Sequence, residues 1–125
     1  MSLVLDSGAL VALERNDRAM WVRLKAAQLD GDIPLTHAGV LAQVWRGGAR
    51  QARLSQALGG IEVRAFDEPL GRAAGQLLGA AGLADVIDAG VVLLAVDGDE
   101  IVTVDREDLE RLAETSGRHV ELIHP

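Results

Sequence analysis

Short runs of apolar residues alternate along the chain with longer segments whose apolar residues recur every three or four positions. The short runs have the length of buried strands, and the longer segments have the periodicity of helices. The predicted strands are Ser2–Leu5, Ile33–Thr36, Ile61–Phe66, Ile101–Val104 and Val120–Ile123. The predicted helices are Ser7–Arg15, Asp17–Leu29, His37–Arg46, Ala49–Leu58, Glu68–Ala81, Asp85–Ala95 and Glu107–Thr115. This alternation predicts one α/β domain over residues 1–125, in which helices cover both faces of a parallel sheet.

Two of the predicted strands end on an aspartate and pass directly into a helix. Asp6 follows the first strand and Asp105 follows the fourth. Because open α/β sheets place their sites at the carboxyl ends of their strands, we expect both carboxylates at that edge. Asp67 also follows a strand, but capping of the next helix explains it. Asp85 and Asp88 are three residues apart at the start of an apolar helix, so they share one helix face.

Carboxylates that converge repel one another unless they are protonated or bridged by a cation. Oxygen ligands suit Mg²⁺, which binds through a few carboxylates and keeps several waters. Such ions polarise a phosphoryl group and activate water, so no protein nucleophile is needed. The acids therefore predict a divalent-cation site that acts on phosphate esters. For Asp85, a plain role as the N-cap of its helix is about as good an explanation.

The 125-residue chain has a net charge of −7, which is spread unevenly. Residues 1–66 carry eight basic and six acidic side chains, whereas residues 97–125 carry three basic and nine acidic ones. An acidic chain is not typical of a non-specific nucleic-acid binder, because neutralisation of phosphates by Lys and Arg dominates that affinity. A nucleic-acid substrate would need a local basic surface and metal ions. The chain has no cysteine and no evident signal peptide or membrane helix, so we expect a cytoplasmic protein without thiolate sites.

Four segments together resemble the motifs of PIN-domain nucleases, and among these the VapC-type toxins of bacterial toxin–antitoxin pairs. They are Leu3–Leu10, Val40–Gly48, Asp88-Ala89 and Val102–Asp105. Each is a weak signal alone, but their order and spacing extend over essentially the whole chain. The resemblance implies five parallel strands flanked by helices and an Mg²⁺- or Mn²⁺-dependent endoribonuclease that cleaves RNA. It also implies a homodimer that a small antitoxin protein silences.

The resemblance also implies roles for individual residues. By their position in the motifs, Asp6, Asp88 and Asp105 match the acids that bind the metal. Ser7 and Thr103 match small hydroxyl residues that support the pocket.

The chain departs from the family at Gln43, where the family has a glutamate. An amide oxygen can bind a cation or its water but adds no negative charge. Asp85, one helical turn from Asp88, could restore that charge. Three interpretations remain open: an active natural variant helped by Asp85, which we favour, a natural variant with poor catalysis, or an engineered inactive form.

Three arginines, Arg46, Arg50 and Arg53, recur at spacings of four and three residues. If the two short helices around them are roughly continuous, these arginines form one basic ridge. Such a ridge would bind RNA phosphates or an acidic partner. A solvated helix face explains the spacing about as well, and the Gly47-Gly48 break weakens the argument for a ridge.

Other acids have simpler explanations. Asp97, Asp99 and Glu100 lie in a turn, where solvation accounts for their charge. Asp108 follows Asp105 by three residues and is a minor candidate for the pocket, since it lies at a helix start.

Other functional classes fit the sequence less well. A haloacid-dehalogenase-like phosphoaspartate enzyme needs an acid two residues after its nucleophile, and Gly8 stands there. A receiver-like module should carry a lysine at the end of its last strand, whereas the single lysine is Lys25. A non-catalytic interaction module with the same fold remains open because of Gln43.

Overall fold

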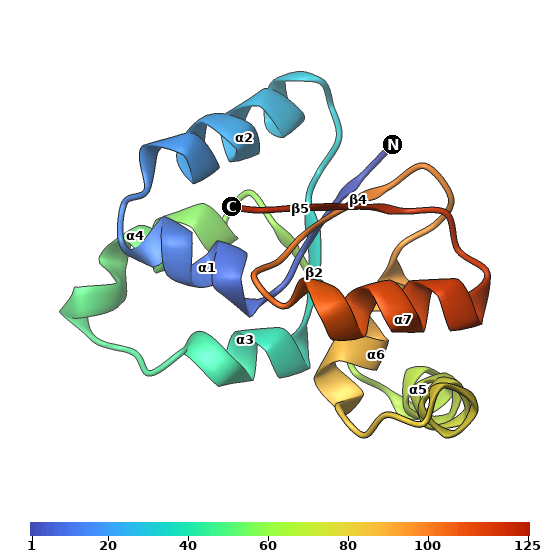
Figure 1. Ribbon diagram of the computed structural model, residues 1–125. Helices are drawn as coiled ribbons and strands as arrows, with labels where there is room; N and C mark the ends of the chain where they lie inside the picture. Colours follow the sequence, from blue (N-terminus) through green and yellow to red (C-terminus); the bar gives the residue numbers. More distant parts are fainter.

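The computed structural model describes residues 1–125 and contains a single five-stranded sheet (Figure 1). The strands are β1 (Leu3–Leu5), β2 (Leu35–His37), β3 (Glu62–Arg64), β4 (Glu100–Val102) and β5 (Glu121–Ile123). Each neighbouring pair is parallel, and the order across the sheet is β3-β2-β1-β4-β5. The predicted α/β class with a parallel sheet of five strands is confirmed.

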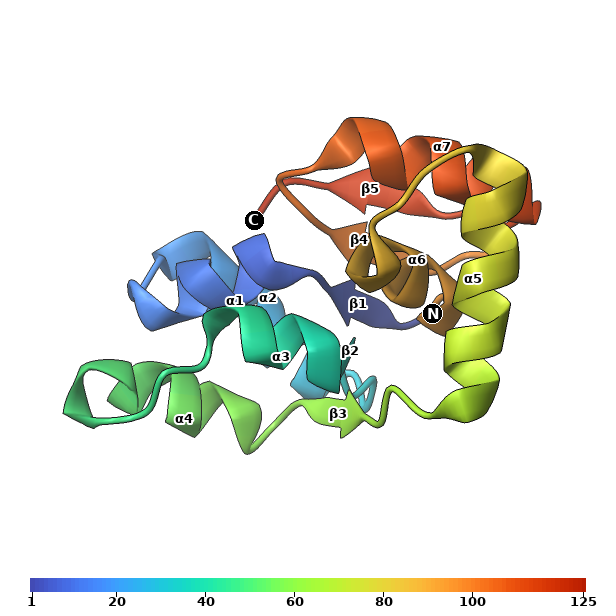
Figure 2. The ribbon, with the colours of Figure 1, turned by 90° about the horizontal axis from the view of Figure 1, so that it is seen from below.

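Two groups of helices cover the sheet. Between β1 and β3 the chain forms α1 (Ser7–Glu14), α2 (Arg18–Leu29), α3 (Ala38–Val44) and α4 (Ala52–Leu58). Between β3 and β5 it forms α5 (Glu68–Ala81), α6 (Val86–Leu94) and α7 (Arg106–Ser116). The chain steps across the sheet in opposite directions in these two halves, so right-handed crossovers place the groups on opposite faces. Figure 2 shows them as two separate clusters.

Helices α5 and α6 meet at a sharp corner. α5 is terminated by its C-cap Gly82, whose φ of 69° is the left-handed conformation that favours glycine. No single helix of the chain is long and apolar enough to span a membrane, whereas α5 and α6 together have the length and composition but are bent by 108°. After the corner, α6 packs on β1 and β2.

Two predicted boundaries differ from the structure for physical reasons. His37 ends β2 and caps α3, because its ring Nδ1 accepts a hydrogen bond of 3.0 Å from the Gly39 N–H. The helix predicted over 49–58 begins as a 3₁₀ turn, η1 (Ala49–Gln51), and only then continues as α4. Gly47 and Gly48 precede that turn with φ of 82° and 88°, which no helix permits.

A cluster of 28 buried apolar residues joins the helices to the sheet. Asp99 is a buried acid with a structural role. The sequence predicts that Asp99 is solvated, but this is wrong, since Asp99 is only 2% exposed. Its carboxylate accepts hydrogen bonds from the N–H groups of Ser2 (2.7 Å) and Val96 (2.9 Å). Asp99 therefore ties the turn before β4 to the start of β1.

The direction of the strand order reverses between β1 and β4, which lie side by side. From β1 the chain leads to β2 on one side, and from β4 it leads to β5 on the other. Such a switch point leaves a crevice at the carboxyl ends of the two strands, where open α/β sheets bind ligands. Asp6 follows β1 and Thr103 follows β4, so both lie at this edge.

Candidate active site

Asp6 is held rigidly at the end of β1. It is 3% exposed and is the N-cap of α1, where its carboxylate accepts a hydrogen bond of 2.8 Å from the Ser7 N–H. The Thr103 hydroxyl donates a second bond of 2.8 Å to the other carboxylate oxygen. Burial raises the pKa of Asp6, the two hydrogen bonds oppose that rise, and the charges of Asp105 and Asp85 add to it.

Thr103 connects two of the acids. While its hydroxyl donates to Asp6, the same oxygen accepts a hydrogen bond of 2.9 Å from the Asp105 N–H. The side chain is 3% exposed. This one hydroxyl therefore fixes the backbone at Asp105 relative to the Asp6 carboxylate.

Asp88 lies in the first turn of α6 and carries the most perturbed carboxylate. It is 5% exposed, and its Oδ2 has no hydrogen-bond partner. Burial, followed by the charges of Asp85, Asp6 and Asp105, raises its pKa from 3.8 to about 8. Asp85 is the N-cap of the same helix and accepts hydrogen bonds from the N–H groups of Ile87 (2.9 Å) and Asp88 (3.1 Å). The N-cap role considered for Asp85 is what the structure shows.

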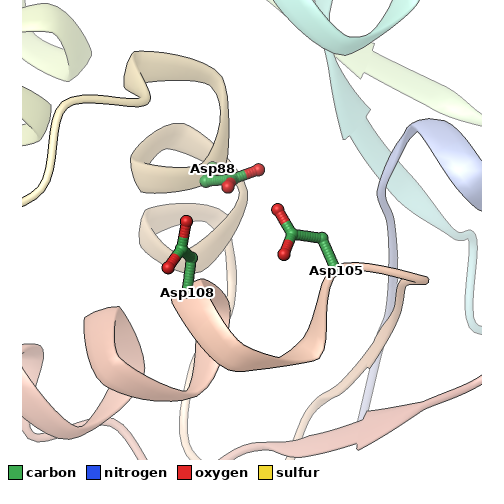
Figure 3. A group of neighbouring side chains, drawn as sticks. All are labelled: Asp88, Asp105 and Asp108. Carbon is green, nitrogen blue, oxygen red and sulfur yellow. The ribbon is translucent and has the colours of Figure 1, made fainter.

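Three carboxylates converge at this edge of the sheet. Asp88 from α6 and Asp105 and Asp108 from the start of α7 place carboxylate oxygens within 4.8 Å of one another (Figure 3). Figure 3 shows the three side chains pointing toward a common space. All the ligand atoms are oxygens, and one buried oxygen lacks a partner, so the group fits a hard cation such as Mg²⁺ or Mn²⁺.

The composition of this group differs from the predicted metal set. Asp88 and Asp105 belong to it, whereas Asp6 and Asp85 lie outside it, with carboxylates that accept hydrogen bonds from backbone and hydroxyl groups, and their metal binding stays a prediction. Asp108, only a minor candidate in the sequence, joins it. The spacing signal was present, since Asp108 follows Asp105 by three residues and so faces the same side of the helix start.

Gln43 lies on α3 and is exposed. A different glutamine, which the sequence analysis missed, is buried. Gln51 is 6% exposed, and its Oε1 accepts hydrogen bonds from the N–H groups of Arg46 (2.7 Å) and Gly47 (2.8 Å). Its Nε2 donates to the Val44 carbonyl at 2.8 Å. No periodic or compositional pattern marks such a residue, because its partners are backbone groups around the end of α3 and the carboxylate of the distant Glu14.

The predicted basic ridge does not form as a continuous helix face. Arg46 lies in the loop after α3, Arg50 in η1 and Arg53 in α4. A surface hollow of about 360 Å³ has Arg46 and Arg50 in its lining, with Arg15 from the end of α1 beside them. Arg53 does not line this hollow. The three arginines that do are Arg15, Arg46 and Arg50.

His37 is fully buried behind the acids. Its Nδ1 accepts from the Gly39 N–H, so its Nε2 carries the proton and donates to the Ile87 carbonyl at 3.0 Å. Burial lowers the pKa of His37, and the bond to Ile87 and the charge of Asp6 oppose that change. The neutral ring thus holds the first turn of α6, which carries Asp88, against β2.

No family model matches the chain, and no curated protein matches its sequence. Among solved structures, it is similar to a chain in the crystal structure of VapBC2 from Rickettsia felis bound to a DNA fragment from their promoter. The TM-score is 0.72 at 17% sequence identity, and the match covers 98% of both chains. The likeness establishes a shared fold over the whole chain, in agreement with the VapC-like fold that the sequence motifs imply.

Proposed function

We propose that the protein is a metal-dependent endoribonuclease of the PIN-domain type and the toxin of a toxin–antitoxin pair. The observation that carries the proposal is the convergence of Asp88, Asp105 and Asp108 at the switch point of the sheet. The shared fold with a chain of VapBC2 supports it. The RNA substrate, and the choice of Mg²⁺ or Mn²⁺, belong to the proposal.

The chain's own residues prepare the site for a cation. Asp88, Asp105 and Asp108 would hold it through carboxylate oxygens, and its charge would offset their repulsion and polarise a bound phosphodiester. Asp6 and Thr103 position the backbone at Asp105 through hydrogen bonds. Asp85 and His37 position the first turn of α6, so that Asp88 faces the cluster.

Gln43 is compatible with activity in this arrangement. The site has three convergent carboxylates without Asp85, because Asp108 supplies the third. We therefore favour the active natural variant, with Asp108 rather than Asp85 supplying the missing charge. Gln43→Glu should then change RNA cleavage by less than about tenfold, whereas a site crippled by Gln43 would gain more from the added charge.

The partners follow from the same comparison. The solved structure is described as VapBC2 bound to a DNA fragment from their promoter, which indicates more than one protein component. A cognate antitoxin protein, a homodimeric state and a cytoplasmic location are proposed for the present chain on that likeness and on the sequence motifs.

The phosphoaspartate alternative has no support at the position that matters. A Cβ at Gly8, two residues after Asp6, would lie 2.9 Å from Cγ1 of Val104, so an acid side chain there would require Val104 to shift. The interaction-module alternative differs from the nuclease in one measurable respect, which is RNA cleavage.

The decisive experiment is cleavage of a structured-RNA pool in Mn²⁺, with and without EDTA. Asp105→Asn removes an exposed carboxylate of the cluster, and Glu107→Gln removes an exposed one next to it on the helix. We expect cleavage that EDTA abolishes, a loss of at least about 100-fold in Asp105→Asn, and no change in Glu107→Gln. Absence of cleavage by the unmodified protein would favour the interaction module, and equal cleavage by both variants would reject the site.

A further inference from the structure

A hollow with an arginine-rich lining lies at the far end of α1 from the acids. We call it the cationic hollow; its volume is about 360 Å³. Its lining consists of Glu14, Arg15, Val44, Arg46, Gly47, Arg50 and Gln51. The chain's two ion pairs use Arg64 and Arg72, so none of the three arginines here is neutralised by an acid. In a chain of net charge −7, this is a local basic surface.

Gln51 keeps these arginines available. Its buried amide donates a hydrogen bond to the Glu14 carboxylate and holds the loop that carries Arg46. The one acid in the lining is therefore bound by a neutral amide rather than by a guanidinium group. None of these three guanidinium groups is paired with a carboxylate, although Nη1 of Arg46 donates to the carbonyls of Ala42 (3.1 Å) and Trp45 (2.7 Å). Such a group of arginines fits an anion, and Arg binds phosphate through parallel N–H donors.

A second hollow of about 430 Å³ lies along one face of α1, and its lining includes Val104, the neighbour of Asp105 in the sequence. It starts at Ser7 and Gly8, directly after Asp6, and ends at Arg15, which lines both hollows. The two ends are about 12 Å apart, given the rise of an α-helix. Its apolar lining consists of Val11, Ala12 and Val104, and Val104 is 61% exposed. Asp17, His124 and Pro125 complete the lining, and we call this space the apolar hollow.

We propose that single-stranded RNA leaves the acidic edge along α1 and enters the cationic hollow, where Arg15, Arg46 and Arg50 bind its phosphates. The inference rests on the ribonuclease function proposed above and adds the path of the substrate. The apolar hollow would cover an unstacked base against Val104, because single-stranded RNA presents its bases to protein surfaces. Phosphate contacts of this kind position a strand without reading its sequence.

An acidic peptide is the competing ligand for the same arginines. The two hollows that share Arg15 favour RNA as the ligand. An RNA strand bound at the acids through a divalent cation carries further phosphates, and the arginines can bind these. The two ligands are separated by experiment.

The test is fluorescence anisotropy of a labelled single-stranded RNA in EDTA, which measures binding without cleavage. The variant Arg15→Gln/Arg46→Gln/Arg50→Gln is compared with Arg18→Gln/Arg72→Gln/Arg111→Gln, which has the same net charge and alters exposed arginines outside both hollows. We expect at least about tenfold weaker binding only in the first variant. In a plot of the logarithm of the binding constant against the logarithm of the salt concentration, the slope of this variant should be shallower by about 2. Each phosphate contact on a single strand contributes about 0.7 to that slope, and the variant removes three arginines.

Equal RNA binding by the two triple variants would overturn the inference, whether or not the protein cleaves RNA. Poly-glutamate serves as the acidic-peptide probe. If the first variant loses poly-glutamate binding while its RNA binding is unchanged, the inference is overturned in favour of an acidic partner. Loss of RNA affinity and slope in the first variant alone supports it, even if no cleavage is found, in which case the proposed function fails separately. Arg50→Glu, a single surface change, serves as the second variant if the triple variant does not fold.

Discussion

The Thr103 hydroxyl donates a hydrogen bond of 2.8 Å to the Asp6 carboxylate, although the two residues are 97 positions apart. The bond joins the ends of β1 and β4 at the switch point of the sheet. Because the same oxygen accepts from the Asp105 N–H, the contact couples a buried acid to an exposed one.

Replacement of Thr103 by valine tests this coupling. Thr103→Val keeps the shape of the side chain but leaves a buried carboxylate oxygen and the Asp105 N–H without their partner. We expect the free energy of unfolding to fall by about 1–3 kcal/mol and RNA cleavage in Mn²⁺ to decrease. Thr103→Ser retains the hydroxyl but loses a buried methyl group, so it should preserve cleavage and lose about 1 kcal/mol of stability. Urea denaturation in EDTA measures the stability, and a Thr103→Val protein as stable as the unmodified protein would show that the bond contributes nothing.

The raised pKa of Asp88 predicts how stability depends on pH in the absence of metal. With a folded pKa of about 8 against 3.8, the folded protein retains a proton that the unfolded chain has released between these values. The associated stability is full below about pH 4 and is lost as the pH rises through about 8. The melting temperature in EDTA should therefore fall from about pH 5 to about pH 9.

Asp88→Asn removes this dependence. Above the pKa of Asp88, the variant should be at least about 1 kcal/mol more stable than the unmodified protein in EDTA, which raises the melting temperature by several degrees. Mn²⁺ should reverse the trend in the unmodified protein, since a cation displaces the proton and binds more tightly at high pH. A melting temperature that rises with pH in EDTA would contradict the burial of a protonated Asp88.

Asp108 should be a metal ligand, whereas Glu110 two residues later should not. We expect Asp108→Asn to weaken Mn²⁺ binding by about tenfold or more, and Glu110→Gln, an exposed acid on the same helix, to leave it unchanged. Isothermal titration of each variant with Mn²⁺ in the absence of RNA makes the comparison. Equal affinities would remove Asp108 from the site and leave Asp88 and Asp105 as its centre.

The sequence was sufficient for the architecture and for part of the site. Apolar runs that end in Asp6 and Asp105 identify the strands on either side of the switch point, because strand ends and helix starts have local signals. The same patterns do not reveal which carboxylates are already hydrogen-bonded. Asp6 and Asp85 accept hydrogen bonds from the chain itself, which the sequence did not reveal, while their binding of a metal stays a prediction.

The remaining differences arise from contacts between distant residues. Gln51 acts through the backbone of Val44, Arg46 and Gly47, and a single glutamine carries no pattern that predicts this. The basic surface likewise depends on how α1 packs beside the loop after α3, which brings Arg15 to Arg46. Spacing along one helix could not anticipate a surface assembled from the end of α1, the loop after α3 and η1.

Glycine at position 90 makes room for His37 and should therefore resist substitution. A Cβ on Gly90 would lie 2.7 Å from both His37 Nε2 and Phe66 Cε2, and His37 holds the first turn of α6. Gly90→Ala should lower the free energy of unfolding by about 1–3 kcal/mol, although alanine favours helices more than glycine does.

Gly75 in α5 is the matched control, because nothing lies within 4 Å of a Cβ built there. Gly75→Ala should raise the free energy of unfolding by about 0.5–1 kcal/mol through helix propensity alone. Thermal melts of both variants, followed by Mn²⁺ titration, separate packing from metal binding. If Gly90→Ala stabilises the protein as Gly75→Ala does, the ring of His37 does not occupy the space beside α6, and its role in placing Asp88 is wrong.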